Sequence, residues 1–237
     1  MILYKYCGPQ RIDILESGRI MLTRARGFND PFELNPHITG IKDNIEYGKH
    51  ITERTKNYVI LSLADNRESL LMWAHYAASH SGFLIGFDAD QDILEGASPH
   101  RDFGPVAYSH SKPAKPTFDE VSNLALFYWK SSEWVYEREW RIIDSAMSAD
   151  GDPVGPAGAC LPFIFRPEAV KEVIYGCKCS IYYELQAVLR EPRYAHVSFI
   201  SATVDREKYK LNFNDFPRSD WDRRMIDATV AAKNTGP

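Results

Sequence analysis

The residues best suited to chemistry lie in the run from Glu133 to Ile143, where acidic, basic and aromatic residues alternate. If this run forms a β-strand, Glu137, Glu139 and Arg141 project from one face, with roughly 7 Å between alternate side chains. Two carboxylates on one face raise each other's pKa, and a neighbouring guanidinium lowers it. This combination is typical of a site in which a glutamate stabilises positive charge on a sugar carbon during glycosidic cleavage.

Two structural alternatives remain open for this run. As a helix, it would carry Glu137 and Arg141 as an ordinary i,i+4 ion pair. As a strand, it could be an ion-paired face without chemistry. Its aromatic and β-branched residues favour the strand, whose other face would hold Trp134, Tyr136 and Trp140.

Aromatic residues in the first third of the chain are candidates for binding a planar ligand. Four of them could stack against a planar leaving group such as nicotinamide: Tyr4, Tyr6, Trp73 and Tyr76. We expect Trp73 and Tyr76 first in the core or in a pocket wall, and only second as groups that stack on a ligand. His75 is a candidate ligand contact, and a hydrogen-bonded structural role is its alternative.

Cationic and amide side chains extend this set. Lys5, Arg24 and Arg26 are candidates for charge-assisted hydrogen bonds to a pyrophosphate. Asn29 opens the run Asn-Asp-Pro-Phe-Glu that ends at Glu33, and an Asp before a Pro is kept out of the α region. We therefore predict a turn there, which is either structural or in contact with a substrate.

Several common catalytic signatures are missing from the sequence. It has no glycine-rich dinucleotide fingerprint, no phosphate loop, no Gly-x-Ser-x-Gly elbow and no His-Glu-x-x-His or Cys-x-x-Cys pair. The four cysteines are too few and too scattered for a disulfide framework, which favours a reducing cytoplasm. His75 and His80 are five residues apart and would point to different faces of a helix, so we expect no metal site.

The composition is that of a folded protein without a strong electrostatic preference. The chain has 237 residues, 44% of them hydrophobic, and a net charge of -4. That charge argues against binding of nucleic acid or anionic lipid over the whole surface, although a local basic patch stays open. Because no apolar run is long enough, we expect neither a membrane span nor a signal peptide.

Apolar and β-branched runs predict strands, and patterns with a period of 3.6 predict helices. The expected strands are residues 2–6, 20–23, 58–62, 83–87, 106–108, 133–143, 161–165, 172–175, 196–200 and 210–213. The expected helices are residues 10–17, 41–57, 68–80, 118–130 and 181–189. We expect one α+β domain over residues 1–217, with a mixed and antiparallel split β-sheet and flanking helices. Residues 148–158 are expected to form a loop that could close over a site, and residues 218–237 a weakly specified polar tail.

Four motifs resemble a known family. They are Tyr4-Lys-Tyr6, Phe28-Asn-Asp-Pro-Phe-Glu33, Leu71-Met-Trp-Ala-His-Tyr-Ala77 with His80-Ser-Gly82, and Trp134-Val-Tyr-Glu-Arg-Glu-Trp-Arg141. In this order they resemble a widespread bacterial family catalogued as domain of unknown function 2971. The resemblance covers residues 4–141 and by itself implies no activity.

More loosely, the order of elements resembles the NAD-using ADP-ribosyltransferase-like fold. That resemblance is carried by a strand with Tyr4, a short helix ending at Gly18, a second strand and a later Glu-x-Glu strand. In that fold a first-strand residue holds NAD, an aromatic side chain flanks nicotinamide and a late-strand glutamate bonds the ribose hydroxyls. The resemblance implies Tyr4 or Lys5 for the first role, although a His or Arg is usual there. It implies Glu139 for the last role, with Glu137 two residues before it.

The resemblance to the ADP-ribosyltransferase-like fold implies an enzyme that cleaves the nicotinamide–ribose bond of NAD. ADP-ribose would pass to a protein or nucleic-acid acceptor or to water, as in a toxin or phage-defence effector. Glu139 would stabilise the oxocarbenium character, Glu137 would orient or deprotonate the acceptor, and Arg141 would hold both carboxylates. Two alternatives stay open. One is a non-catalytic nucleotide- or partner-binding module, and the other is a hydrolase of another glycosidic or phosphoester bond.

Overall fold

The computed structural model describes residues 1–24, 27–35, 37–38, 43–96, 101–115, 124–146 and 160–221. It divides the chain into two compact units. Unit 1 is built from residues 1–17, 67–93 and 166–237, and unit 2 from residues 18–66 and 94–165. Both units are discontinuous in sequence, so the chain passes between them four times. The single domain expected over residues 1–217 stays a prediction.

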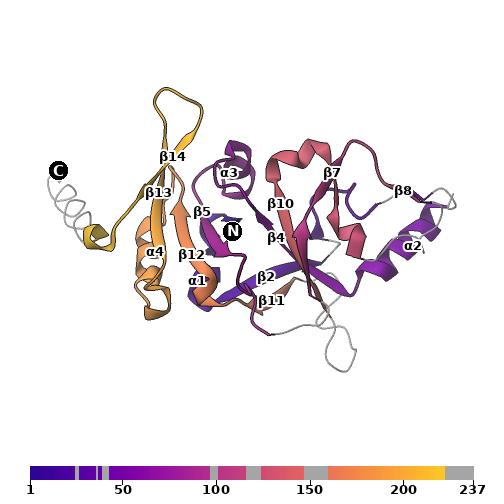
Figure 1. The fold of residues 1–237 in the computed structure, drawn as a ribbon, viewed down its shortest axis with the longest axis horizontal. Coiled ribbons are helices and arrows are strands. Elements are labelled where there is room, and N and C mark those ends of the chain that lie inside the picture. The colour runs from indigo at the N-terminus through magenta and orange to yellow at the C-terminus, as the bar shows by residue number, and fades with distance from the viewer. Residues whose placement is uncertain are drawn as a thin grey trace, which may run out of the picture. The chain divides into compact units, whose positions relative to one another are not determined.

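Unit 1 contains strands in the order β1-β5-β12-β13-β14 (Figure 1). Their bounds are β1 (Ile2–Cys7), β5 (Phe83–Asp88), β12 (Val170–Tyr175), β13 (Ser198–Val204) and β14 (Leu211–Asp215). β12 and β13 are parallel and the other neighbouring pairs are antiparallel, so this sheet is mixed. The inner strand β5 is buried along nearly its whole length, as its continuous apolar sequence predicts.

The helices of unit 1 are short. They are η1 (Pro9–Ile12), α1 (Asp13–Ser17), α3 (Leu70–Tyr76), η6 (Pro167–Ala169), α4 (Tyr182–Leu189), η7 (Pro192–Tyr194) and η8 (Arg218–Asp220). α4 packs on the sheet through Tyr182, whose ring centroid lies 5.5 Å from that of Tyr175 on β12 and 6.5 Å from that of Phe199 on β13. Leu185 and Leu189, one turn apart, are fully buried. The helix predicted over residues 181–189 is therefore confirmed.

The helix predicted over residues 68–80 is shorter than expected. The side chain of Ser69 caps α3 by accepting a backbone N–H at 3.3 Å, and the helix ends at Tyr76. The turn after it contains three successive residues with positive φ: Ala78 (47°), Ser79 (54°) and His80 (70°). Such backbone angles are costly for residues with a Cβ and require support from the surrounding structure. At Gly82 a Cβ would lie 2.0 Å from the carbonyl oxygen of Cys7, so this position requires glycine.

Unit 2 contains an antiparallel sheet in which β11, β2, β4, β10 and β6 are neighbours in that order. The bounds are β2 (Arg19–Arg24), β4 (Tyr58–Ala64), β6 (Asp102–Pro105), β10 (Glu139–Ser145) and β11 (Leu161–Ile164). Two short parallel pairs accompany it: β3 (His37–Ile38) with β8 (Ala114–Lys115), and β7 (Ala107–Ser109) with β9 (Trp129–Ser131). The helices are α2 (Asn44–Thr55), η4 (Leu124–Tyr128) and η5 (Ser132–Glu137).

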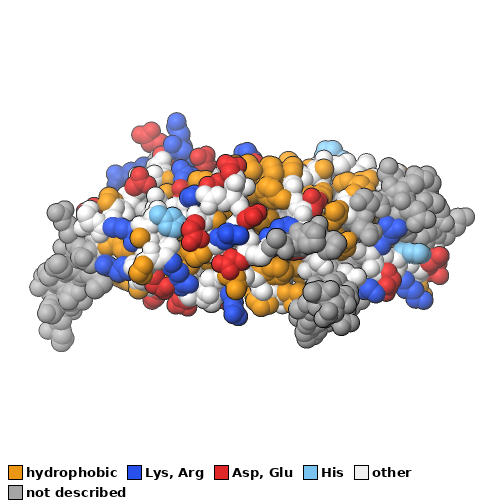
Figure 2. All heavy atoms as spheres, turned by 60° about the horizontal axis from the view of Figure 1, so that its bottom comes forward, with side chains coloured by type: hydrophobic (Ala, Val, Ile, Leu, Met, Phe, Trp, Pro, Cys, Tyr) orange, Lys and Arg blue, Asp and Glu red, His pale blue; other side chains and the backbone are white. Residues whose placement is uncertain are grey.

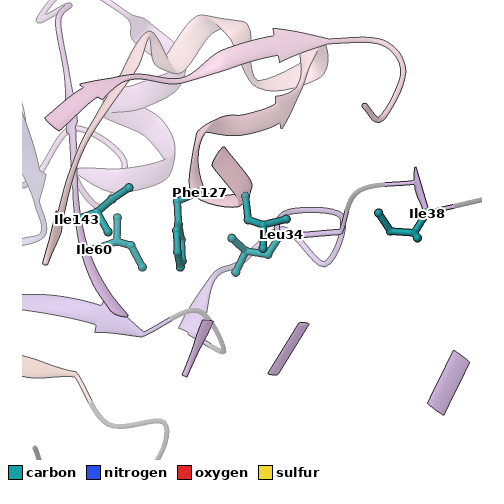
Figure 3. Close-up of a cluster of buried hydrophobic side chains, with 6 residues drawn as sticks. Leu34, Ile38, Ile60, Phe127 and Ile143 are labelled. Atoms are coloured by element: carbon teal, nitrogen blue, oxygen red, sulfur yellow. The ribbon is translucent and has the colours of Figure 1, made fainter. Parts of the chain in front are cut away.

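A hydrophobic cluster holds the segments of unit 2 that carry the charged residues (Figure 3). It joins Leu34 from the turn after Asn29, Ile60 of β4, Phe127 of η4 and Ile143 of β10. These segments are far apart in sequence. The cluster therefore brings the turn, η4 and β10 together before any polar contact is considered.

Two predicted elements have the wrong type. Residues 133–143 do not form one strand, because η5 occupies residues 132–137 and β10 begins only at Glu139. The helix predicted over residues 118–130 is replaced at its end by the 3-10 helix η4 and the strand β9, while residues 116–123 lie outside the described part. In both cases the aromatic residues fit helix and strand patterns equally well, and contacts with distant segments decide between them.

The remaining expectations concern the class of fold, the C-terminal residues and the membrane. The α+β class with mixed and antiparallel strands is confirmed. At the start of the predicted tail, Trp221 is buried and Arg218 lies 4.6 Å from the centroid of its ring, whereas residues 222–237 and the predicted loop 148–158 are not among the described residues.

No helix in the described part of the chain has the length and apolar character needed to cross a membrane. Figure 2 shows acidic and basic side chains interspersed on the visible face, without a field of one sign.

Candidate functional site

Five charged side chains of unit 2 converge in its interior and form the charged cluster: Glu33, Lys130, Glu137, Glu139 and Arg141. Their side chains are only 1–6% exposed. They come from the turn that begins at Asp30, from β9, and from η5 and β10. Charged groups at this depth are tolerated only when they are paired and hydrogen-bonded.

The ammonium group of Lys130 contacts all three carboxylates. Its Nζ lies 2.6 Å from Oε2 of Glu137, 3.1 Å from Oε2 of Glu139 and 3.1 Å from Oε1 of Glu33. An ammonium has three N–H donors, so each carboxylate can receive one of them. Lys130 is therefore the centre of the charged cluster.

The guanidinium of Arg141 holds two of the carboxylates from the other side. Its Nε and Nη2 donate to the two oxygens of Glu139 at 2.8 and 2.9 Å, which is the bidentate geometry. Nη2 also pairs with Oε2 of Glu33, and Nη1 donates to the carbonyl oxygen of Phe127. The ring of Phe28 lies 4.8 Å from the guanidinium carbon. All three guanidinium nitrogens of Arg141 therefore have acceptors, and one aromatic ring lies beside the group.

One residue separates η5 from β10, and therefore Glu137 from Glu139. This residue, Arg138, is the C-cap of η5 and adopts a left-handed conformation with a φ of 45°. The N–H of Glu139 donates to the hydroxyl oxygen of Tyr108 at 2.8 Å. The guanidinium of Arg138 pairs separately with Asp65 at 2.6 Å.

Burial and pairing shift the pKa values of two carboxyl groups in opposite directions. Burial opposes ionisation of Glu139, but the adjacent cations and a hydrogen bond with Ser62 outweigh it and lower the pKa of Glu139 to about 2. For Glu33, burial outweighs the attraction of the same cations and raises the pKa. Glu139 is therefore an anion at neutral pH, and Glu33 binds a proton before Glu139 does.

A pocket of about 450 Å³ lies against the charged cluster. Lys130 itself lines this pocket, and so do the chain neighbours of two cluster residues: Phe32 and Leu34, which flank Glu33, and Trp129, which precedes Lys130. Small-molecule sites occupy about 300–1,000 Å³ and are mostly apolar with a few polar groups. The pocket has the size of such a site, and Lys130 is the member of the charged cluster that lines it.

The turn predicted after Asn29 is confirmed and positions one wall of the pocket. Oδ1 of Asp30 accepts the N–H of Phe32 at 2.8 Å, and the N–H of Glu33 donates to the carbonyl oxygen of Asp30 at 3.2 Å. Leu34 has a φ of 57°, an uncommon value for a branched residue. The local geometry thus places Glu33 inward while Phe32 stays 67% exposed.

The candidate residues of the first strand belong to unit 1, where they form a separate polar group. The hydroxyl of Tyr4 donates to Oε1 of Glu172 at 2.8 Å, and Nη1 of Arg67 pairs with the same oxygen at 3.1 Å. Burial, followed by the charge of Glu172, raises the pKa of Tyr4. Lys5 is half-buried on the same strand.

The aromatic candidates of unit 1 pack mainly in its core. Trp73 is fully buried, and its ring centroid lies 5.6 Å from that of Tyr6 and 6.2 Å from that of His80. Its indole N–H donates to the carbonyl oxygen of Arg67 at 2.8 Å. For Trp73 and Tyr6 the core role that the sequence left open is the one the contacts support. The remaining two candidates, His75 and Tyr76, are exposed and half-buried, respectively.

Two further candidates lie in unit 2 and outside the charged cluster. Arg24 is buried, and its Nη1 donates to the carbonyl oxygen of Lys56 at 2.7 Å. Asn29 is exposed. The third cation proposed for a pyrophosphate, Arg26, is not among the described residues. Of the predicted site residues, unit 2 therefore joins Glu137, Glu139 and Arg141 in one group.

Sequence reasoning missed Glu33 and Lys130 as members of this group. Glu33 ends the Phe28–Glu33 motif, and a carboxylate at the end of a turn motif is a feature that could have indicated it as a site residue. The predicted helix 118–130 ends at Lys130, and nothing in the local sequence indicates that this lysine has three carboxylate partners. Among the described residues, no group of His, Cys, Asp or Glu side chains has an arrangement that could hold a metal ion.

The fold and the site define an α+β protein with a buried charged cluster beside a pocket of small-molecule size. A sequence model of the family described as protein of unknown function (DUF2971) matches residues 72–142. This match supports the resemblance to that family and includes four cluster residues: Lys130, Glu137, Glu139 and Arg141. No curated protein and no solved structure matches the chain.

Proposed function

We propose that this protein is an ADP-ribosyltransferase-like enzyme that cleaves the nicotinamide–ribose bond of NAD. The observation that carries the proposal is the pairing of Glu137 and Glu139 with Lys130, a residue that also lines a pocket of about 450 Å³. The use of NAD rests on the loose resemblance of the element order to that fold. A likeness at the level of the fold supports the use of NAD by analogy, and the residues of the charged cluster are the groups that would carry out the reaction.

The bond that breaks joins C1′ of the ribose to the ring nitrogen of nicotinamide. Both electrons of that bond go to the ring nitrogen, so the leaving group becomes neutral and positive charge develops at C1′. Glu139 remains ionised because its pKa is about 2, and a fixed carboxylate stabilises such charge without reorganisation. Glu137 accepts the proton of the attacking water or acceptor hydroxyl. Arg141 and Lys130 are positioning residues.

A substrate must replace one of the present contacts of Glu139. A carboxylate offers about four lone-pair sites, and here they serve two donors of Arg141, the ammonium of Lys130 and Ser62. Lys130 has two other carboxylates to bond. We therefore assign the contact between Lys130 and Glu139 as the one that a ribose hydroxyl displaces.

Acceptor and compartment are part of the same proposal. ADP-ribose would pass to a protein, to a nucleic acid or to water, and an effector role as a toxin or in phage defence would follow from the first two. A cytoplasmic location is supported by the four cysteines, all of which are free thiols.

Turnover of NAD by the purified full chain tests the proposal. Released nicotinamide is measured by chromatography, with water alone and with a mixture of protein and nucleic-acid acceptors. We expect Glu139→Gln to lower the rate by about 100-fold or more, the loss typical of a removed electrostatic stabiliser. Glu53→Gln is the matched control, since Glu53 is 68% exposed and pairs with Lys56, which caps the C-terminal end of α2.

Melting curves of each variant show whether a loss of activity is caused by unfolding. Glu137→Gln is a second test variant, because it leaves the Glu139–Arg141 pair intact. A wild-type protein that leaves NAD unchanged under all acceptor conditions would show the proposal to be wrong.

A second candidate function is a non-catalytic binding module. It is favoured by one observation: every carboxylate of the charged cluster is already paired and at most 6% exposed. Ligand binding stabilises a fold by RT ln(1 + [L]/Kd). NAD or ADP-ribose that raises the melting temperature without any release of nicotinamide would support this function.

A further inference from the structure

A second pocket, of about 520 Å³, lies in unit 1, and we name it the hairpin pocket. Most of its lining comes from residues 204–211, which run from the end of β13 to the start of β14. The rest comes from Leu70 at the start of α3, His80 in the turn after that helix, and Cys177 and Lys178 after β12. The connection between β13 and β14 projects beyond these two strands (Figure 1). No residue of the charged cluster lines this pocket.

Basic side chains outnumber acidic ones in the lining of the hairpin pocket. The charged residues of the lining are Lys178, Asp205, Arg206, Glu207, Lys208 and Lys210. Together they carry a net charge of +2 when ionised, whereas the whole chain has a net charge of -4. The pocket is therefore a local positive region on an acidic protein, and such a region attracts anions that the rest of the surface repels.

The turn of the hairpin occupies the carboxylate of Asp205. Its Oδ1 accepts the backbone N–H groups of Glu207 and Lys208 at 2.9 and 2.8 Å. Its Oδ2 accepts from the side chain of Asn212 at 3.0 Å and lies 3.8 Å from Nζ of Lys210. These hydrogen bonds lower the pKa of Asp205 to about 2, so the group is an anion that belongs to the turn.

The other basic residues of the lining are not paired in this way. Within the part of the chain that the structure describes, Lys178, Arg206 and Lys208 form no ion pair. All three are exposed. Their charges are therefore available to an anion that enters the pocket.

The backbone of the turn that carries His80 fixes this residue at the pocket. His80 is the last of three successive residues with positive φ, and its ring is stacked on that of Trp73 at 6.2 Å between centroids. Its carbonyl oxygen accepts the N–H of Lys178 at 3.0 Å, and a Cβ at Gly176 would lie 2.2 Å from the same oxygen. The turn and the loop after β12 are therefore held together closely. Strained backbone of this kind is concentrated at functional sites.

The imidazole of His80 gives an independent indication of a ligand. Its Nδ1 is buried and has no hydrogen-bond partner among the described residues, which is rare for a buried polar atom. Burial, followed by the charge of Lys178, lowers the pKa of His80. Both effects oppose a positive charge on the ring, and an anion bound beside His80 and Lys178 would favour that charge.

We propose that the hairpin pocket binds the phosphate group of a small phosphorylated molecule. Lys178, Arg206 and Lys208 donate charge-assisted hydrogen bonds to the phosphate oxygens, and His80 supplies a further donor beside them. The fully exposed side chain of Tyr209 offers a ring face to the rest of the ligand. The inference does not depend on the proposed function, because no residue of the hairpin pocket takes part in the proposed reaction.

Size and charge favour a small ligand over a polymer. A volume of about 520 Å³ lies within the range of about 300–1,000 Å³ that small-molecule sites occupy. A nucleic acid would extend beyond the pocket and meet the surface of a protein whose net charge is -4. A ligand with one or two phosphates meets only the positive region.

Calorimetric titration of the full chain at constant ionic strength tests the inference. The probes are inorganic pyrophosphate, uridine 5′-monophosphate and uridine, the last two of which differ only in the phosphate. We expect both phosphates to bind and uridine to show no binding at millimolar concentration. Lys178→Gln should weaken the binding of pyrophosphate about fivefold, which is the upper end for one exposed ion pair. Arg206→Gln combined with it should weaken binding further.

Lys171→Gln is the matched control. Lys171 is a partly exposed lysine of β12 in the same unit, and it pairs with Asp88 at 3.6 Å and does not line the pocket. We expect this variant to bind pyrophosphate as the wild type does. A loss as large as that of Lys178→Gln would count against the pocket, because the overall charge of unit 1 would then explain the binding. If Lys178→Gln does not fold, Arg206→Gln on the exposed connection takes its place.

Further outcomes would overturn the inference. They are equal binding of uridine and its monophosphate, no binding of either phosphate at millimolar concentration, and binding that neither Lys178→Gln nor Arg206→Gln weakens. Binding of a single-stranded oligonucleotide without any binding of pyrophosphate would also overturn it, since the site would then serve a polymer. None of these measurements uses NAD turnover, so failure of the inference and failure of the proposed function are seen separately.

Discussion

Unit 1 and unit 2 each bury carboxylates beside cations, but they balance them differently. In unit 1, one carboxylate oxygen of Glu172 accepts the hydroxyl of Tyr4 and pairs with Arg67, whose side chain stays 33% exposed. In unit 2, three carboxylates share two cations at an exposure of 6% or less. The first group has no net charge and is partly exposed, whereas the second has surplus negative charge and is buried.

The difference separates a structural contact from a candidate site. A balanced pair near solvent contributes little to stability and places no demand on its surroundings. An unbalanced buried cluster is costly unless a proton or ligand completes it, and costly groups persist where they serve function. The comparison therefore favours unit 2 as the location of the proposed active site.

Removal of the guanidinium should give the largest difference between the units. Arg141→Met leaves Glu139 and Glu33 buried without one of their cations, and we expect it to lower the free energy of unfolding by about 3–5 kcal/mol. The matched change Arg67→Met in unit 1 should cost within about 1 kcal/mol. Urea unfolding of both variants measures this. Equal losses would mean that the two groups are energetically alike.

The second largest effect is expected from acid, which lowers the stability of the fold by protonating Glu139. Its pKa is about 2 in the fold and 4.5 ordinarily, so its stabilisation is complete above pH 4.5 and is lost as the pH falls towards 2. The shift corresponds to about 3 kcal/mol. Glu33 acts in the opposite direction, because its raised pKa gives stability that is full below pH 4.5 and is lost as the pH rises through the folded value.

Unfolding measured between pH 7 and pH 2 checks this window. We expect Glu139→Gln to flatten the loss below pH 4.5 and Glu53→Gln to leave it unchanged. An acid profile that Glu139→Gln does not alter would show that other carboxyl groups cause it.

Removal of one hydroxyl in unit 1 should give the smallest effect. Tyr4→Phe removes the hydrogen bond to Glu172 but keeps Arg67 beside that carboxylate, so we expect a loss of about 1 kcal/mol. Nicotinamide release by this variant should equal that of the wild type if the chemistry resides in unit 2. A strong loss of turnover with normal stability would instead assign Tyr4 to the reaction.

Much of the strand content could be predicted from the sequence. The apolar runs that predict β1, β4 and β5 are short and rich in β-branched or aromatic residues, with one polar residue in each of the first two, Lys5 and Ser62. Such runs fit buried strands. The turn after Asn29 was predictable because Asp before Pro restricts the backbone directly. These strands and this turn depend on neighbouring residues, so the local sequence is enough to predict them.

The charged cluster was only partly predictable, because its contacts are not local. The spacing of Glu137, Glu139 and Arg141 predicts one strand, but η5 ends at Glu137 and β10 begins at Glu139, with the left-handed residue Arg138 between them. The contact between Arg141 and Glu33 joins residues 108 positions apart. Spacing rules reach a few residues, whereas burial of this group depends on the tertiary packing of the turn, η4 and β10.

The discontinuous make-up of the units has a consequence for synthesis on the ribosome. Every segment of unit 2 precedes residue 166, so all its strands are translated before β12, β13 and β14 of unit 1. Unit 1 needs both β1, which is translated before every segment of unit 2, and these three strands, which are translated after them. The charged cluster of unit 2 can therefore assemble before the sheet of unit 1 is complete.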